Sequence, residues 1–222
     1  MTDNLINDKE KFFNGWAPYY DCLLTTVNYQ AIHQRLLEYV VLEENAEVLD
    51  LGCGTGRLLN RLAEKEPTLR GIGIDVSREM LRQARARNQY RERLIFIQGN
   101  AASLPFSEKQ FAAVFCTLSF LHYPNPQQIL NEVSRVLSPG GRFYLVDSCI
   151  KEKNISNSIP WVGKIQLYNQ QQREQLGREA GLKCLSHRYL LPKVLLTILA
   201  KPEREQETVT SHQLKIGLTH SH

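Results

Sequence analysis

A run of glycines between Asp50 and Gly56 is the feature of the sequence that points most clearly to a ligand. The run reads Asp-Leu-Gly-Cys-Gly-Thr-Gly, and it lies between the apolar stretch 48–51 and a stretch with helical spacing. Glycines at a strand-to-helix turn let the backbone bend sharply and approach a flat ligand, because no Cβ stands in the way. We therefore expect a nucleoside-containing cofactor here, the alternative being a tight turn without a ligand. The loop residues expected in the site are Asp50, Gly52, Cys53, Gly54 and Gly56.

Two phosphate-bearing ligands fit the loop poorly. A P-loop carries Gly-Lys-Ser or Gly-Lys-Thr after its glycines, whereas Gly56 is followed by Arg57. A dinucleotide fingerprint needs Gly or Ala three residues after Gly54, and Arg57 is too bulky for that position. A nucleoside without phosphates remains. Asp75 supports it, because this carboxylate ends a predicted strand and can accept hydrogen bonds from both ribose hydroxyls. The alternative role for Asp75, capping a helix, is already offered by Ser77.

Alternating strands and helices must position these residues. Helical spacing of apolar residues predicts a helix ending near Leu42 and further helices at 57–65, 77–88, 126–137 and 170–180, the last closed by Gly181. Short apolar runs predict strands at 48–51, 71–75, 94–98, 111–117 and 142–147, the last after a turn at 138–141. Residues 182–191 and 193–200 predict a hairpin turned at Pro192, and the stretch 150–168 looks irregular. This alternation is typical of right-handed βαβ units with a parallel sheet.

The bulk composition excludes several classes of protein. With 222 residues, 42% of them hydrophobic, the chain can bury one sizeable core, so we expect a single domain. The five cysteines are scattered singly and no histidine cluster has metal-ligand spacing, so the sequence predicts neither a metal site nor a disulfide framework. No signal peptide and no run of 18 apolar residues is found, which leads us to expect a soluble, cytoplasmic protein.

Six arginines lie between Arg78 and Arg93, and the formal net charge of the chain is +4. Such a cluster could contact RNA or an anionic membrane surface. We interpret it as a solvated helix face and expect no nucleic-acid partner, while peripheral contact with a membrane stays open.

Four motifs in order give the sequence a family resemblance. Residues 48–56 resemble the first motif of class I S-adenosylmethionine-dependent methyltransferases, and residues 73–77 their acidic second motif. Residues 98–106 are similar to the adenine-binding segment, and residues 137–142 to the turn before the fifth strand. The resemblance implies a three-layer α/β/α Rossmann-like fold. Its mostly parallel, seven-stranded sheet would have the order 3-2-1-4-5-7-6 with strand 7 antiparallel, and S-adenosyl-L-methionine is the implied cofactor.

The resemblance also assigns contacts to the cofactor. Asn100 stands where the family often has Asp, facing the adenine amino group, and its amide oxygen can still accept a hydrogen bond. Ala101 would offer its backbone N–H to the adenine ring. The further implied contacts are Val76, Met80, Cys116 and Tyr20.

The aromatic N-terminal segment is the second informative resemblance. Residues 16–21 resemble the Tyr-Asp element that opens the ubiquinone/menaquinone-biosynthesis (type 11) methyltransferases, where it folds over the cofactor. The alternative is that these aromatic residues plug the end of the core. We expect an N-terminal lid at 1–26, a methyltransferase domain at 27–202 and a disordered polar tail at 203–222.

The implied chemistry asks mainly for orientation. A sulfonium makes its methyl group electrophilic, so the protein has to hold a nucleophile in line behind it. A carbon or oxygen acceptor also needs a base. His122 is the candidate, with a structural role as its alternative, and Tyr20, Tyr168 and Asp147 are weaker candidates.

The expected substrate is a small or mid-sized, partly apolar molecule, because the stretch 150–168 leaves room for a short apolar lid and not for a recognition domain. Two other functions stay open. One is a cofactor-binding homologue without transfer activity that serves as a regulator or assembly partner, and the other is an RNA methyltransferase. The oligomeric state is left open.

Overall fold

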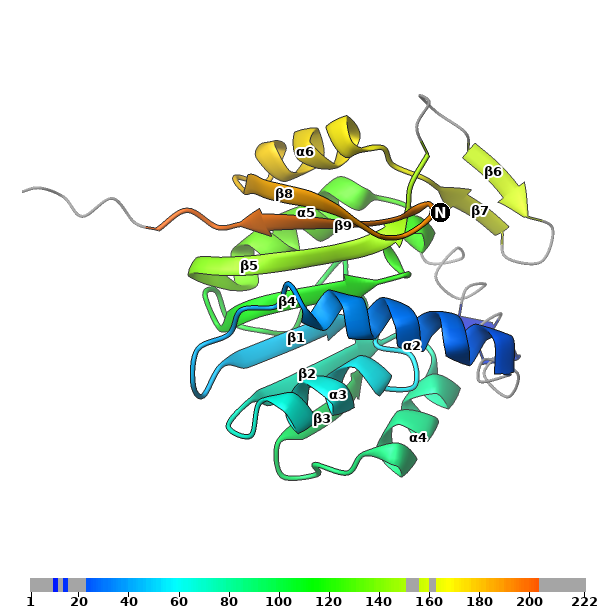
Figure 1. Cartoon of the computed structure of the whole chain (residues 1–222), viewed down its shortest axis with the longest axis vertical. Coiled ribbons are helices and arrows are strands. Elements are labelled where there is room, and N and C mark those ends of the chain that lie inside the picture. The colour runs from blue at the N-terminus through cyan, green and yellow to red at the C-terminus, as the bar shows by residue number, and fades with distance from the viewer. Residues whose placement is uncertain (1–9, 12–13, 16–22, 151–155, 160–162, 204–222) are drawn as a thin grey trace, which may run out of the picture.

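The computed structural model describes residues 10–11, 14–15, 23–150, 156–159 and 163–203 (Figure 1). Seven strands form one sheet in the order β3-β2-β1-β4-β5-β9-β8, which confirms the order implied by the family resemblance. Strand β9 is antiparallel to both of its neighbours, and the pairs among β1 to β5 are parallel. The strands are β1 (Glu47–Leu51), β2 (Arg70–Asp75), β3 (Leu94–Gln98), β4 (Phe111–Thr117), β5 (Leu137–Ser148), β8 (Lys183–Leu191) and β9 (Val194–Ala200).

Helices cover both faces of this sheet, which gives the three expected layers. Helices α2 (Leu23–Leu37), α3 (Arg57–Lys65) and α4 (Arg78–Arg87) share one apolar cluster with one face of the sheet. Helices α5 (Pro126–Val136) and α6 (Gln170–Glu179) pack on the other face. Neighbouring residues of β1 divide between the clusters, with Val48 in the first and Leu49 in the second. Since successive strand side chains point to opposite faces, a strand buried on both sides is mostly apolar, and Asp50 is the buried exception in β1.

Side-chain caps fix where three of the helices begin. Ser77 accepts a hydrogen bond from the N–H of Met80 and starts α4. Asn125 caps α5, which has a proline in its first turn, and Asn169 forms a capping box with Gln172 at α6. These caps satisfy backbone donors that the first helical turn leaves unpaired.

The prediction of a helix running to about Leu42 is wrong at its end, because α2 ends at Leu37. The chain then turns, with the N–H of Tyr39 donating to the carbonyl of Leu36. Farther on, the N–H of Val41 donates to the Tyr144 hydroxyl at 3.1 Å. The apolar residues after the helix are therefore held against the core by a side chain of β5. Although these residues have helical spacing, the helix does not continue through them.

Two further differences concern strands. The stretch 150–168, expected to be irregular, contains strands β6 (Ser156–Ile159) and β7 (Gly163–Gln166), which pair antiparallel. Strand β5 begins at Leu137, so the predicted turn lies inside it. At the predicted turn the strand is distorted. Gly140 has φ 77°, and the register against β4 shifts between Phe111 and Ala113.

Two arginines of the arginine-rich segment form hydrogen bonds within the fold. The guanidinium of Arg85 donates to the carbonyl of Phe96, and Arg93 donates to the carbonyls of Ala63, Glu66 and Leu69. These contacts bind helix α4 and its following loop to strand β3 and to the end of α3. Within the described ranges, no helix is long and apolar enough to cross a membrane.

The predicted domain boundaries fall at the edges of what the structure describes. Helix α2 begins at Leu23, four residues before the expected start of the domain at residue 27. The aromatic segment 16–21 and residues 204–222 lie outside the described residues.

Candidate cofactor-binding site

The glycine loop adopts backbone angles that other residues rarely take. Gly52, Gly54 and Gly56 have φ values of 66°, 51° and 73°, all in the left-handed region. A Cβ on Gly52 would lie 2.6 Å from the Cβ of Ser119, and one on Gly56 would lie 2.7 Å from the ring of Phe96. Both positions therefore need glycine for their conformation and for the space around them.

Asp75 ties this loop to the end of β2. Its carboxylate accepts a hydrogen bond from the N–H of Gly54 at 2.9 Å through one oxygen and from the N–H of Ser77 at 2.9 Å through the other. Burial raises the pKa of Asp75, and the backbone donors of Ser77 and Gly54 oppose the rise. The helix cap is the hydroxyl of Ser77, which accepts from Met80. Since each carboxylate oxygen carries two lone pairs, Asp75 keeps accepting capacity for a ligand.

A cavity of about 230 Å³ opens beside this loop at the carboxyl ends of the strands. This is the edge of an open α/β sheet at which ligands bind. Eight of the residues predicted for the site line the cavity: Gly52, Gly54, Asp75, Val76, Met80, Asn100, Ala101 and His122.

Four predicted residues lie behind the cavity wall, and Tyr20 lies outside the described residues. Asp50 and Cys116 are buried in β1 and β4. Cys53 and Gly56 belong to the glycine loop itself but do not line the cavity. Burial raises the pKa of Asp50, and the neighbouring charge of Asp75 raises it further. Burial likewise raises the pKa of the Cys116 thiol.

The opposite wall follows strand β4 and was missed by sequence reasoning, apart from His122. Ser119 donates to the carbonyl of Leu51 at 2.8 Å, and Gln128 donates to the carbonyl of Ala102 at 2.9 Å. The order of the strands could have indicated these residues, because the segment after β4 reaches the same sheet edge as the glycine loop. The lining residues on this side that the sequence analysis omitted are Thr117, Leu118, Ser119, Tyr123, Pro124, Asn125, Gln128 and Ile129.

Leu118 marks this wall as conformationally unusual. It lines the cavity and has φ 57°. This is the left-handed backbone region, which residues other than Gly, Asn and Asp seldom adopt. Its N–H donates to the carbonyl of Val146 in β5 at 2.8 Å, which holds the turn in place. Strained backbone maintained in this way is common at functional sites.

Two of the weaker candidate bases do not line the cavity. Asp147 is buried at the end of β5 and accepts hydrogen bonds from the N–H groups of Leu121 and Ser148. Burial raises the pKa of Asp147 to about 6, although the charge of Arg173 opposes the rise. Tyr168 packs its ring against Phe120 with 5.4 Å between the ring centroids. Asp147 therefore supports the short 3₁₀ helix Phe120–His122 from behind, and His122 in that helix reaches the cavity.

Arg173 carries a buried charge that the sequence analysis did not single out. Its side chain is 1% exposed, and its guanidinium donates to the backbone carbonyls of Tyr168, Leu195, Asp147 and Ser148. These bonds join α6 to the ends of β5 and β9, and they place a positive charge near the buried Asp147. A nearby charge of opposite sign reduces the cost of burying both groups.

The charges around the cavity limit the kinds of ligand that it can bind. Among the described residues that line it, Asp75 is the one carboxylate, and there is no lysine or arginine. Basic side chains often bind nucleotide phosphates, and this lining offers none among its described residues. The lining therefore suits an uncharged or cationic nucleoside better than a phosphorylated one.

Comparison with known proteins agrees with this geometry. The family model described as "Methyltransferase domain" matches residues 42–201. The chain belongs to this methyltransferase family. Membership confirms the resemblance to class I S-adenosylmethionine-dependent methyltransferases that the four motifs indicated.

Individual members of the methyltransferase family resemble the chain over part of their length. A demethylmenaquinone methyltransferase from Lactiplantibacillus plantarum is 31% identical over 156 residues, covering 67% of this chain and 65% of the relative. A 2-phytyl-1,4-naphtoquinone methyltransferase from Thermosynechococcus vestitus is 30% identical over 142 residues, covering 62% and 63%. The chain thus spans less than two thirds of the length of these relatives.

A solved structure shows the same fold at lower identity. In the Haloferax volcanii complex between a methyltransferase activator and a methyltransferase, one chain matches with a TM-score of 0.78 and 23% identity. The match covers 89% of this chain and 99% of that one, so the fold is shared from end to end of the solved chain.

Proposed function

We propose that this protein transfers the methyl group of S-adenosyl-L-methionine to a small or mid-sized, partly apolar acceptor. The observation that carries the proposal is the cavity in which the glycine loop, Asp75 and the pair Asn100–Ala101 face the wall that follows β4. A lining with one carboxylate and no basic side chain among its described residues matches a cationic donor without phosphates.

The chain's own groups match the parts of this cofactor. Asp75 would accept hydrogen bonds from the ribose hydroxyls with the lone pairs that Gly54 and Ser77 leave open. Val76 and Met80 offer apolar contact beside it. The glycine loop lets the backbone approach closely, since a Cβ on Gly52 would already collide with Ser119.

Asn100 has an additional bond that bears on the adenine contact. Its side-chain oxygen accepts a hydrogen bond from the N–H of Ala102 at 2.9 Å. This bond fixes the direction of the amide, which leaves one lone pair of that oxygen for the adenine amino group. Ala101, which lines the cavity beside it, would donate its backbone N–H to the ring.

The apolar part of the wall after β4 supports an apolar acceptor. Leu118, Pro124 and Ile129 line the cavity there, together with Thr117 and Tyr123. The two relatives described above are named as methyltransferases of quinones. A ring with an apolar substituent is therefore the first acceptor class to test.

Catalysis would rest on orientation and exclusion of water. When bound, S-adenosylmethionine supplies an electrophilic methyl group on its sulfonium. The two walls of the cavity would hold the acceptor atom in line with it, and such orientation supplies much of the acceleration. For a carbon or oxygen acceptor, an imidazole nitrogen of His122 would take the acceptor's proton.

The activity can be tested without knowing the acceptor. The protein is incubated with methyl-deuterated S-adenosylmethionine and either a metabolite extract or a set of demethylated quinones. We expect new products heavier by one labelled methyl group, formed in step with S-adenosylhomocysteine. Tight binding of the donor without any labelled product, across extracts and quinones, would instead identify a binding protein without transfer activity.

Replacing Asp75 tests the assignment of the donor site. Asp75→Ala removes the acceptor of two hydroxyl hydrogen bonds and frees the N–H of Gly54. Hydrogen bonds to a charged group contribute about 1.5–3 kcal/mol each, so the affinity for S-adenosylmethionine should fall at least about 100-fold in calorimetry.

The matched control is Glu79→Ala, which removes a nearby carboxylate that pairs with Arg82 on the surface of α4. It should bind the donor as the natural protein does. An Asp75→Ala protein that is folded by circular dichroism and retains its affinity would show that the donor binds elsewhere.

A further inference from the structure

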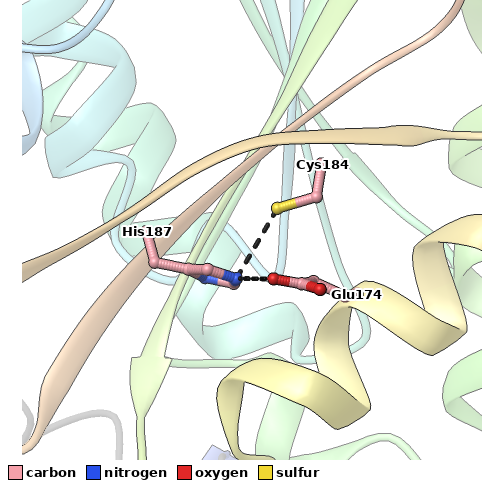
Figure 2. Close-up of side chains that lie close together, drawn as sticks. All are labelled: Glu174, Cys184 and His187. Carbon is pink, nitrogen blue, oxygen red and sulfur yellow. Dashed lines mark hydrogen bonds and ion pairs between the residues drawn. The ribbon is translucent and has the colours of Figure 1, made fainter.

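A second group of reactive side chains lies at the outer strand β8, away from the cofactor cavity. Glu174 comes from α6, and Cys184 and His187 come from the edge strand β8 (Figure 2). Strands β5 and β9 separate β8 from β4, the last strand that contributes to the cavity. These three residues therefore have no part in the proposed methyl transfer.

A distortion of β8 brings Cys184 and His187 to the same side. Residues three apart on a regular strand point to opposite faces. Cys184 pairs with Leu199 and Ser186 with the next residue, Ile198, so Leu185 is an extra residue in β8. Such a bulge reverses the alternation and re-aims the side chains that follow. Figure 2 shows the outcome, with both side chains directed toward Glu174 on the neighbouring helix.

The donor atoms converge on one nitrogen. His187 Nε2 lies 2.8 Å from Glu174 Oε1 and 3.6 Å from Cys184 Sγ. The three donor atoms all lie within 4.8 Å of one another. A carboxylate, an imidazole and a thiol in this arrangement are ligand types that Zn²⁺ accepts together.

The same three residue types occur in nucleophilic triads, but this geometry does not form one. In a triad, the nucleophile contacts one ring nitrogen and the carboxylate orients the other. Here Glu174 and Cys184 approach the same nitrogen, and Nδ1 is 3.0 Å from the hydroxyl of Thr197. Two groups that approach the same ring nitrogen are placed to bind a cation together with it. They are not placed to pass a proton through the ring from one group to the other.

The distances are close to those of a tetrahedral site. With metal–sulfur and metal–nitrogen bonds of about 2.3 and 2.0 Å, a tetrahedral angle separates the two donor atoms by about 3.5 Å. The gap between Cys184 Sγ and His187 Nε2 is 3.6 Å. The carboxylate would have to withdraw from Nε2 by about 0.5 Å to reach a metal–ligand geometry. The Glu174 side chain is 39% exposed, so it has room to make this adjustment.

Thr197 provides the outer contact that metal-binding histidines usually have. It is fully buried in β9, and its hydroxyl can accept a hydrogen bond from Nδ1–H, which would leave Nε2 unprotonated for a metal. The imidazole is itself only 13% exposed and so is held in one orientation.

We infer that Glu174, Cys184 and His187 bind one divalent transition-metal ion, with zinc as the preferred ion. The mixed sulfur, nitrogen and oxygen donors favour zinc or cobalt over magnesium and calcium, which take oxygen ligands. Three protein ligands leave a fourth position for water, and binding joins α6 to the edge strand. The spacing of single cysteines and histidines predicted no metal site, because it could not relate Glu174 to β8.

Cobalt(II) reports the ligands directly. We expect the full chain, purified without a metal-affinity tag, to bind one cobalt ion with tetrahedral d–d absorption and a thiolate-to-cobalt charge-transfer band. Cys184→Ser should remove this band, and Glu174→Gln should keep it while weakening affinity at least about tenfold. Zinc should displace the cobalt and raise the midpoint of thermal unfolding of the natural chain more than that of either variant.

The control variant is Glu179→Gln, which changes a carboxylate on the same helix that pairs with Gln175. It should bind cobalt as the natural chain does. Residues 204–222 include three histidines, His212, His220 and His222. Cobalt bound by them would show no charge-transfer band and would persist in Cys184→Ser. That result, or a band that survives Cys184→Ser, would overturn the site.

Discussion

His122 and Asp147 show how differently two titratable side chains at one end of the sheet can serve the site. His122 lines the cavity, whereas Asp147 lies behind it and accepts the N–H of Leu121, the residue just before His122. Asp147 is therefore a positioning residue for the histidine. Of the candidate bases within the described residues, His122 alone reaches the cavity.

Removing the imidazole should separate catalysis from binding. A general base contributes about 100-fold or more, so His122→Gln should lower kcat by at least about that factor on a carbon or oxygen acceptor. The affinity for S-adenosylmethionine should stay within about twofold, because the proposed donor contacts lie on the other wall. Turnover and calorimetry on the same preparation give both values. Unchanged turnover would show that His122 only completes the cavity wall.

At the scale of elements, the glycine loop and the segment after β4 fit together as one unit. Gly52 is in contact with Ser119, whose hydroxyl bonds to the carbonyl of Leu51 and lies 3.0 Å from the sulfur of Cys116. The loop's conformation thus depends on a side chain from another strand-to-helix connection. Any group larger than hydrogen on Gly52 must displace one of the two cavity walls.

Two glycine substitutions isolate this fit. Gly181 has φ 74° with no atom near its missing Cβ, whereas Gly52 has φ 66° and Ser119 within 2.6 Å. Gly181→Ala should cost about 1–2 kcal/mol of unfolding free energy from backbone strain alone. Gly52→Ala should cost a further 1–3 kcal/mol or so from overpacking. Urea unfolding of both variants measures the difference, and equal losses would show that Ser119 yields without cost.

At the scale of the whole molecule, burial on both faces of the sheet also encloses groups that titrate. His33 on α2 is buried under α3, with Nδ1 2.8 Å from the guanidinium of Arg61. The pKa of His33 is lowered to about 3, mainly by burial and also by the charges of Arg61 and Arg57. The folded protein therefore holds this histidine neutral.

This burial makes stability depend on pH in a defined direction. Between about pH 6.5 and 3 the unfolded chain binds a proton at His33 that the folded chain does not, so stability falls as the pH falls. From pH 7 to 5 the natural chain should lose about 2 kcal/mol more than His33→Gln, which can still accept from Arg61 and does not titrate. Urea unfolding at both pH values measures this. Buried carboxyls such as Asp147 act equally in both proteins and cancel, so parallel losses would show that His33 is protonated in the fold.

The order of strands and helices and one wall of the cavity could be predicted from the amino-acid sequence. Strands β3 and β4 have the predicted bounds, because short apolar runs between polar turns have few other ways to be buried. The glycine loop and Asp75 were also readable from the chain. Their roles depend on local geometry, namely a strand, a turn with positive φ and the strand that follows.

Which distant side chains contact one another could be seen in the folded structure alone. Ser119 against Gly52, Asp147 behind His122, and Glu174 beside Cys184 and His187 are contacts between separate elements. Their formation depends on sheet order, on strand register and, for the last group, on one extra residue at Leu185. A bulge of one residue reverses the faces of the side chains that directly follow it, and spacing along the chain carries no record of that reversal.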